Sequence, residues 1–555
     1  MTTKGFCTPL IVLIATMAAL VSCDVVGNDD FLDRHQVDQP SPANFFVDEA
    51  SARQAVVAAY RPWARGSANM YQRDFQIMFD GMSDDAYWRP SRAASIQQSN
   101  WNINSDHSVI GSYWQQVYRS VNASNYAIEN IPILLDKGLE QEQLDPYIAE
   151  ARFIRGFSYL FLVNFFGEVP LVVKPLNSFE EFSQPRASVE KVFEQIIADF
   201  TFAREHLPES WPSAQTGSAT KATAAAYLAK AHLYDENFPA AEEAARTAID
   251  IAEASGYHLV DDYMSIFDID NEANPELLFY ISFMDNDPDQ GSNDVVQKIA
   301  RDVPPELVHI WGFAGWGYHL PQRDLYDAYE DGDPRRAYTI FAPGDDFGTY
   351  TSGTPFTYTH QTYNENGELE TYERTYNQGD TVEYDYRWSE TGLNVRKGIY
   401  NLGHLANERW AGLDVPLMRM ADLYLILAEA LAEQGDPEAL DWVNQVRARG
   451  SVNMPPKTTA DGDLVDLVRH ERRVELGMEG HRLWDLVRWR EVKNVFGDGR
   501  QVKRHFFSDY LPADDLNSRF ANPDLDNYPG DLVLFPIPQD EIDQNSNIND
   551  QNPGY

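Results

Sequence analysis

Two short stretches of the chain combine aromatic rings with charged and amide side chains. The first, MSDDAYWRP at 82–90, places two carboxylates, two rings and a guanidinium in a segment without helical periodicity, and SNWNINSD follows at 99–106. The second, HIWGFAGWGYHLPQRDL at 309–325, alternates rings with glycines. Because glycines disfavour a regular helix, we expect these rings to project from a loop.

This combination of side chains suits a polyhydroxylated ligand. Sugar rings stack their C–H faces on aromatic planes, while carboxylates and guanidinium groups bond to hydroxyls. The alternative is that the rings only pack these loops onto the scaffold. We expect at least two of the set to line a ligand site, since pockets combine aromatic rings with a few polar groups. The candidate ligand-binding residues are Asp84, Asp85, Tyr87, Trp88, Arg89, Trp101, Asn102, Trp311, Phe313, Trp316 and Tyr318.

A second candidate site is the stretch HERRVELGMEGHRLWD at 470–485. It opens like the zinc motif H-E-x-x-H, but Val474 stands where the second histidine belongs, and His481 lies at no ligand spacing. The charges alternate in sign instead, which favours a salt-bridge lattice along one helix over a metal site. Its members are Glu471, Arg472, Arg473, Glu475, Glu479, Arg482, Asp485 and Arg488.

The acidic stretch MDNDPDQGSND at 284–294 is a candidate calcium site. Asp285, Asp287 and Asp289 are spaced as in an EF-hand loop, but Gln290 replaces the required glycine and Val296 the required glutamate. An EF-hand is therefore not expected. A looser structural calcium site stays open, and no other metal or cofactor is predicted.

No familiar catalytic signature occurs in the sequence. A Ser-His-Asp context, G-x-S-x-G, a P-loop and a dinucleotide fingerprint are all missing. A glycoside hydrolase needs two carboxylates roughly 5–10 Å apart, and with 86 Asp+Glu such pairs are common. A hydrolase therefore remains an alternative to a binding protein.

The charge balance limits the classes of partner. The chain of 555 residues has 44 Lys+Arg against 86 Asp+Glu, a formal net charge of −42. Such a field repels nucleic acid and anionic membrane surfaces, so neither is expected as a partner. A neutral ligand is favoured.

The N-terminus resembles a lipoprotein signal. Lys4 precedes the apolar run PLIVLIATMAAL, which is too short to span a bilayer, and LVSC ends at Cys23. This predicts a signal peptide over 1–22, acylation of Cys23 and a flexible, acidic tether over 23–45. The alternative is ordinary cleavage beside an incidental cysteine.

The rest of the sequence reads as a mainly α scaffold that carries a loop-rich, partly β region. Apolar residues recur at helical spacing from about residue 48, and 222–252 and 419–449 each predict a helix pair with a tight turn. Ala229, Ala241 and Ala248 have the spacing of small residues in tetratricopeptide repeats. Residues 280–395 are irregular, with a hairpin signal at Asn366-Gly367.

Five segments, in order, resemble motifs of the RagB/SusD family of nutrient-uptake lipoproteins. They are YIAEARFIRGFSYLFLVNFFGEVPLV, GSATKATAAAYLAKAHLYDENF, RMADLYLILAEALAEQGDPEALDWVNQVRARG, HERRVELGMEGHRLWDLVRW and LFPIPQDEIDQNSNINDQNPGY. The resemblance covers nearly the whole chain after Cys23. It implies a SusD-like fold with an N-terminal helical region over 46–270 and a C-terminal region over 271–555.

The resemblance also implies a function. Members of the family are lipid-anchored on the outer face of the outer membrane, where they bind oligosaccharides, or in some cases peptides, and pass them to a SusC-like TonB-dependent transporter. They are not enzymes. The sequence thus predicts a glycan-binding surface lipoprotein. A surface glycoside hydrolase and a peptide-binding member of the family are the alternatives.

Overall fold

The computed structural model describes residues 42–555 apart from 65–69, 72–74, 90–96, 100, 177–178, 213–216, 272, 285–292, 295–300, 309–314, 365, 400–409, 498–501, 511–524 and 526–530. The signal peptide, Cys23 and residues 23–41 of the predicted tether lie outside the described residues. The tether's last four residues are helical, in α3 (Pro42–Phe45). In the described ranges, no helix combines the length and the apolarity needed to cross a membrane.

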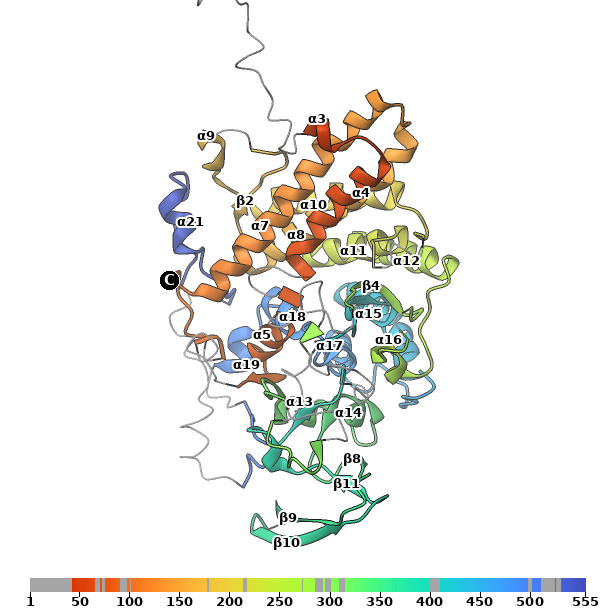
Figure 1. Ribbon diagram of the computed structural model, residues 1–555, viewed down its shortest axis with the longest axis vertical. Helices are drawn as coiled ribbons and strands as arrows, with labels where there is room; N and C mark the ends of the chain where they lie inside the picture. The colour runs from red at the N-terminus through yellow and green to blue at the C-terminus, as the bar shows by residue number, and fades with distance from the viewer. Residues whose placement is uncertain are drawn as a thin grey trace, which may run out of the picture.

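Four long helices form the upper part of the molecule in Figure 1: α4 (Glu49–Ala64), α7 (Ser108–Asn130), α8 (Gln141–Phe166) and α10 (Val189–His206). Helix α8 packs against the other three. Local signals set the ends of these helices. The Ser188 side chain accepts a hydrogen bond from the backbone N–H of Lys191 at the start of α10, and α8 ends at Gly167, whose φ is +68°.

The predicted helix pairs are present. Helix α11 (Lys221–Tyr234) packs against α12 (Phe238–Ala254), and α15 (Met420–Glu433) packs against α16 (Ala439–Arg447). Ala229, Ala241 and Ala248 are fully buried, because small side chains let neighbouring helices approach closely. Helix α12 also packs against α15, so the two pairs stack into one scaffold, at the right of Figure 1.

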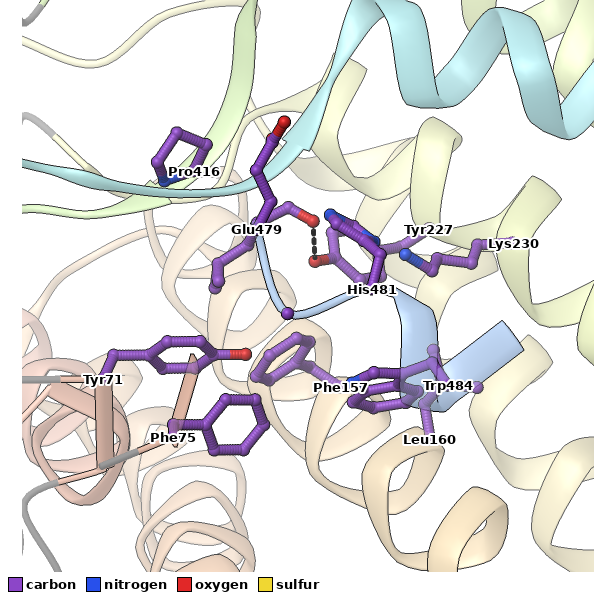
Figure 2. A pocket seen from close by; sticks show the side chains of 12 residues that line it. Tyr71, Phe75, Phe157, Leu160, Tyr227, Lys230, Pro416, Glu479, His481 and Trp484 are labelled. Atoms are coloured by element: carbon purple, nitrogen blue, oxygen red, sulfur yellow. Dashed lines mark hydrogen bonds between the residues drawn. The ribbon is translucent and has the colours of Figure 1, made fainter. Parts of the chain in front are cut away.

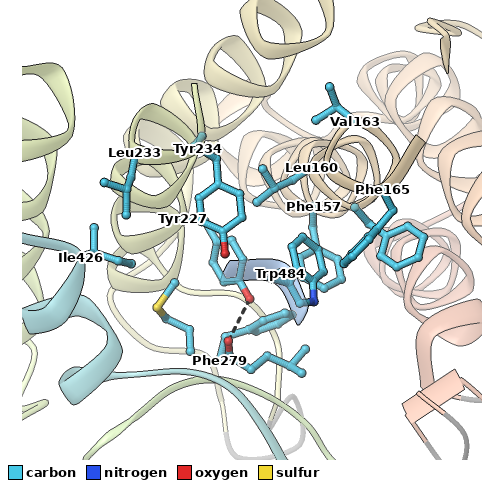
Figure 3. Packing of buried hydrophobic residues seen from close by; sticks show 14 of the residues in the cluster. Phe157, Leu160, Val163, Phe165, Tyr227, Leu233, Tyr234, Phe279, Ile426 and Trp484 are labelled. Carbon is cyan, nitrogen blue, oxygen red and sulfur yellow. Dashed lines mark hydrogen bonds between the residues drawn. The ribbon is translucent and has the colours of Figure 1, made fainter. Parts of the chain in front are cut away.

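The main core combines many aliphatic side chains with a cluster of aromatic rings, part of which Figure 3 shows. Phe157 and Phe165 of α8 face Tyr227 of α11 and Trp484 of α18 (Arg482–Arg488). The Phe157 and Tyr227 ring centroids are 5.5 Å apart, and those of Phe165 and Trp484 are 4.7 Å apart, both edge to face. Each edge-to-face pair adds about 0.5–1.5 kcal/mol beyond the burial of its two rings. This core joins α8 to helices from the C-terminal half of the chain.

The β structure consists of short two-stranded pairs. Strand β4 (Leu277–Ile281) pairs with β14 (Val415–Arg419), and the predicted hairpin is formed by β9 (Phe356–Tyr363) and β10 (Leu369–Tyr376). Figure 1 shows this hairpin at the bottom of the molecule. Gly367, with φ +74°, provides the left-handed backbone of its turn.

The remaining elements are short. The helices are α5 (Phe75–Gly81), η2 (Ile131–Lys137), α9 (Phe179–Phe182), η4 (Tyr263–Phe267), α13 (Arg323–Ala328), α14 (Pro334–Thr339), η7 (Tyr386–Trp388), α17 (Leu464–Leu476), α19 (Val492–Phe496) and α21 (Gln539–Gln544). The strands are β1 (Ala86–Trp88), β2 (Val169–Pro170), β3 (Arg186–Ala187), β5 (Asn293–Asp294), β6 (His319–Pro321), β7 (Ile340–Phe341), β8 (Asp346–Thr349), β11 (Thr381–Glu383), β12 (Asn394–Val395) and β13 (Trp410–Ala411).

The charged residues of α17 correct one sequence prediction. They form ion pairs, but the partners come mostly from distant elements and the pairs are buried. Glu475 contacts Arg335 at 2.9 Å, Arg419 at 2.7 Å and Arg449 at 3.0 Å, all essentially inaccessible to solvent. These guanidinium groups hold the pKa of Glu475 well below its usual range against the opposing effect of burial. The motif is thus a buried cross-link between distant elements and not a lattice along one helix.

Candidate functional site

Two of the predicted ligand-binding stretches meet through a strand pair. Strand β1 runs antiparallel to β6, and Trp88 lies opposite His319 while Tyr87 lies opposite Leu320. The pairing continues beyond the strands, because the backbone N–H of Arg89 donates to the carbonyl oxygen of Tyr318 at 3.2 Å. The structure therefore brings residues 84–89 beside residues 316–321.

The solvent-facing part of this junction is the aromatic surface, defined as Trp316, Tyr318, Arg89 and Glu390. The Trp316 side chain is 49% exposed, and its ring centroid lies 6.0 Å from that of the half-buried Tyr318, with 33° between the planes. The guanidinium of Arg89 lies 5.9 Å from the Tyr318 ring centroid. Two neighbouring rings with a cation beside them form a platform on which a flat ligand face can stack.

Arg89 is held in place by two further contacts. Its Nη1 donates to the carbonyl oxygen of Trp316 at 3.2 Å, and its Nε forms an ion pair of 2.6 Å with Glu390. The Glu390 carboxylate is partly exposed, so it retains acceptor capacity for a ligand hydroxyl. Glu390 was not among the predicted site residues. It lies in the irregular region 280–395, but no feature of the local sequence WSETG distinguishes it.

Asp84 and Asp85 do not face the aromatic surface, contrary to the prediction for these carboxylates. Both are fully buried. Asp84 forms ion pairs with Arg482 at 2.8 Å and with Arg473 at 3.0 Å, and Asp85 pairs with Arg473 at 2.7 Å. Burial raises the pKa of Asp85, and the Arg473 guanidinium opposes that rise. These pairs fasten the loop before β1 to α17 and α18.

Three of the predicted aromatic residues belong to the interior. Tyr87 and Trp88 are buried in β1, and burial raises the pKa of Tyr87 to about 12. Trp101 is 2% exposed, and its Nε1 donates to the Met82 carbonyl oxygen at 3.1 Å. Distant segments cover these three rings, so the structure places them in the interior and not on the aromatic surface. The Trp101 ring, for example, packs against Phe496.

The other predicted residues are placed as follows. Asn102 is exposed, and its backbone N–H bonds to the Gln97 carbonyl oxygen, but among the described contacts none joins it to the aromatic surface. Trp311 and Phe313 lie outside the described residues, as do Asp285, Asp287 and Asp289 of the calcium candidate. In the part of the chain that the structure covers, no group of three His, Cys, Asp or Glu side chains could hold a metal ion.

A small internal pocket lies deeper, between α8, α11 and α18 (Figure 2). Its lining includes Tyr71, Phe157, Lys230 and His481, and its volume of about 30 Å³ is close to that of a single water molecule. Lys230 forms an ion pair with Asp422 at 3.2 Å. The pocket is too small for a saccharide and forms part of the core.

Comparison with known proteins gives consistent matches along the chain. A family model described as the SusD family matches residues 275–555, and one described as "Starch-binding associating with outer membrane" matches residues 30–233. The SusD-like protein P2 of Formosa agariphila is 28% identical over 544 residues, which cover 96% of this chain and 97% of that protein.

Solved structures show the same fold. A SusD-like carbohydrate binding protein from Bacteroides fragilis is 25% identical with a TM-score of 0.70, and the match covers 91% of this chain and 100% of the other. A laminarin binding SusD-like protein is 24% identical with a TM-score of 0.65, and covers 92% of this chain and 100% of the other. The mainly α architecture described above is therefore that of SusD-like structures.

Proposed function

The chain belongs to the SusD family, and from this premise we propose that it is a surface lipoprotein that captures oligosaccharides for a TonB-dependent transporter of the outer membrane. Carbohydrate binding is supported at the level of the family by its starch-binding description and by the carbohydrate- and laminarin-binding relatives. Acylation of Cys23, exposure on the cell exterior and partnership with a SusC-like barrel belong to the proposal. So does the division of the chain at residues 270/271.

The observation that carries the proposed ligand site is the exposure of Trp316 beside Tyr318. Full burial of a large apolar side chain stabilises a protein by roughly 1.5–3 kcal/mol. Because Trp316 keeps about half of its surface in water, part of this free energy is not gained. A ligand that stacks on this ring would recover part of that energy. Arg89 and Glu390 supply donors and acceptors at the edge of the rings, where sugar hydroxyls project.

The buried carboxylates favour binding over hydrolysis. A glycosidase needs a pair of carboxylates that flank the scissile bond. Asp84 and Asp85, the pair adjacent to β1, are instead neutralised by Arg473 and Arg482 inside the protein. Glu390 is also ion-paired, with Arg89. We propose that the protein holds its ligand without cleaving it.

Isothermal titration calorimetry of the full chain in detergent tests this function. Laminarihexaose and maltoheptaose are the probes, because relatives are described as laminarin binding and starch-binding. We expect saturable binding to at least one probe and no release of reducing ends. Sustained hydrolysis abolished by one Glu or Asp substitution would favour the hydrolase, and binding of peptides alone would favour the peptide-binding alternative.

Attachment and partnership need experiments in cells. The Cys23→Ala variant should leave the membrane fraction, and antibody labelling of intact cells should detect the unaltered chain. Co-purification of an outer-membrane barrel with the unaltered chain would support the transporter partnership. Retention of Cys23→Ala in the membrane would contradict lipid anchoring.

A further inference from the structure

A groove separate from the aromatic surface lies between α7, α21 and the segments 170–176 and 182–184. Its volume is about 520 Å³, within the roughly 300–1,000 Å³ typical of small-molecule sites. Figure 1 shows α9 and α21 at the upper left, whereas α13, which follows β6 and the aromatic surface, lies in the lower half. No residue of the aromatic surface lines the groove.

One face of α7 forms the floor of the groove. Positions three, four and seven residues apart share a helix face, and the floor residues follow this spacing. They are Gly111, Trp114, Gln115, Tyr118, Arg119 and Asn122. Helix α7 approaches the segment before α21 at Gly111, where an added Cβ would lie at an ordinary contact distance of 3.9 Å from Pro538.

The opposite wall is fixed by hydrogen bonds at both ends of α21. At its start, the backbone N–H of Gln539 donates to the Ser105 carbonyl oxygen at 2.9 Å. Just after its end, Nδ2 of Asn545 donates to the Gln184 carbonyl oxygen, also at 2.9 Å. The groove is therefore held open by contacts between segments far apart in the chain, and a ligand would not need to order it first.

Three aromatic rings line this groove. The centroids of Trp114 and Tyr118 are 4.9 Å apart, and both side chains are fixed by hydrogen bonds: Trp114 Nε1 donates to Glu541 at 3.3 Å, and the Tyr118 hydroxyl donates to the Pro170 carbonyl oxygen at 2.8 Å. Phe182 of α9 is 59% exposed. Trp114 is only 5% exposed and Tyr118 is partly buried, so Phe182 provides most of the accessible ring surface on which an apolar ligand face can stack.

The polar lining determines the class of ligand. Four side-chain amides, those of Gln115, Asn122, Gln184 and Gln544, provide both donors and acceptors without charge. The charged lining consists of one guanidinium, Arg119, against two carboxylates, Asp540 and Glu541. An anionic ligand would meet net repulsion here and across a chain of net charge −42. A neutral ligand with hydroxyl groups and apolar faces matches this lining.

We infer that this groove is a second saccharide-binding site, for a neutral oligosaccharide. The inference rests on the proposed function for its ligand class, a saccharide, but it uses none of the residues of the aromatic surface. Two sites on one chain would let a single polymer bind twice, which raises the apparent affinity for long chains when the sites can be bridged.

The test is a titration of the full chain in detergent with laminarihexaose and with maltoheptaose. We expect two equivalents bound per chain for at least one probe. Phe182→Ala lies at an exposed position and should not affect folding. It should lower the affinity for one of the two bound equivalents by about three- to tenfold, the range for one stacking contact. Asn122→Ala is a second exposed groove variant, and Tyr372→Ala, which removes a 45% exposed ring on β10, is the control.

The outcomes separate this inference from the proposed function. Binding of a single equivalent per chain that is lost in Trp316→Ala and unchanged in both groove variants would overturn the second site and leave the proposed function standing. One equivalent that is lost only in the groove variants would support the groove and contradict the assignment of the aromatic surface. No binding of either probe would contradict both.

Discussion

Arg89 and Glu390 form an ion pair of 2.6 Å although they are 301 positions apart in the sequence. The same guanidinium bonds to the Trp316 carbonyl oxygen and lies beside the Tyr318 ring. One arginine therefore joins three segments at the aromatic surface. The pair is partly exposed, and such pairs contribute only about 0–1 kcal/mol to stability, so its main effect is on the position of Arg89.

Glu390→Gln should weaken glycan binding without weakening the fold. The substitution removes the charge that orients Arg89 and one strong acceptor, and the loss of such a hydrogen bond corresponds to about a two- to tenfold drop in affinity. Calorimetric titration with the probe that binds measures the change. Glu370→Gln, at an exposed site on β10, is the matched control. An unchanged dissociation constant in Glu390→Gln would remove Glu390 from the site.

Trp316→Ala should lower the affinity of the aromatic surface by about tenfold, because it removes the more exposed of the two stacking rings. Its free energy of unfolding should change by less than about 0.5 kcal/mol, as is usual for surface positions. Titration and urea denaturation on the same preparation separate the two effects. Full binding by this variant would show that the ring takes no part in recognition.

Trp101→Ala should lower the stability of the fold and leave ligand binding intact, the opposite of Trp316→Ala. This ring is buried against Phe496 and Phe535, so its removal should cost about 3–5 kcal/mol of unfolding free energy, as for large aromatic residues in a core. A lower urea midpoint with an unchanged slope would show this loss. Any variant that remains folded should still bind the probe. A selective loss of binding with full stability would restore Trp101 as a ligand residue.

His481 should make stability depend on pH. Burial lowers its pKa from 6.5 to about 4 in the fold, with Lys230 adding to the effect and Asp422 opposing it. Between pH 6.5 and 4 the unfolded chain therefore binds a proton that the folded chain does not. The contribution of the neutral side chain is complete above pH 6.5 and is lost as the pH falls toward 4.

His481→Gln removes this proton uptake, so the free energy of unfolding should fall less steeply over that range, by up to about 1.4 kcal/mol per pH unit. Urea denaturation at half-unit steps from pH 6.5 to 4 measures the slope. The exposed His258→Gln variant serves as the control. Equal slopes in the unaltered chain and in His481→Gln would contradict a buried neutral histidine.

Local signals in the sequence were enough to predict the scaffold. The spacing of Ala229, Ala241 and Ala248 marks the helix pair α11–α12, and Asn366-Gly367 marks the hairpin. Each of these features depends on residues a few positions apart, and such interactions act in the same way wherever the segment lies in the fold.

Ring type and loop context predicted a ligand surface in two stretches, but only tertiary structure decided which rings face solvent. Trp88 and Trp101 are covered by segments far away in the chain, whereas Trp316 is left half exposed. Solvent exposure depends on every neighbour in space, and none of these neighbours can be read from the residues beside a given ring.

The charged residues of α17 illustrate the same division. The sequence determined that Glu471, Glu475 and their neighbours would be ion-paired, because opposite charges this dense find partners. It did not determine that Arg335, Arg419 and Arg449 would supply the pairing for Glu475 inside the protein. A burial of this kind is stable only when the chain brings several opposite charges to one point, and that depends on the packing of the whole fold.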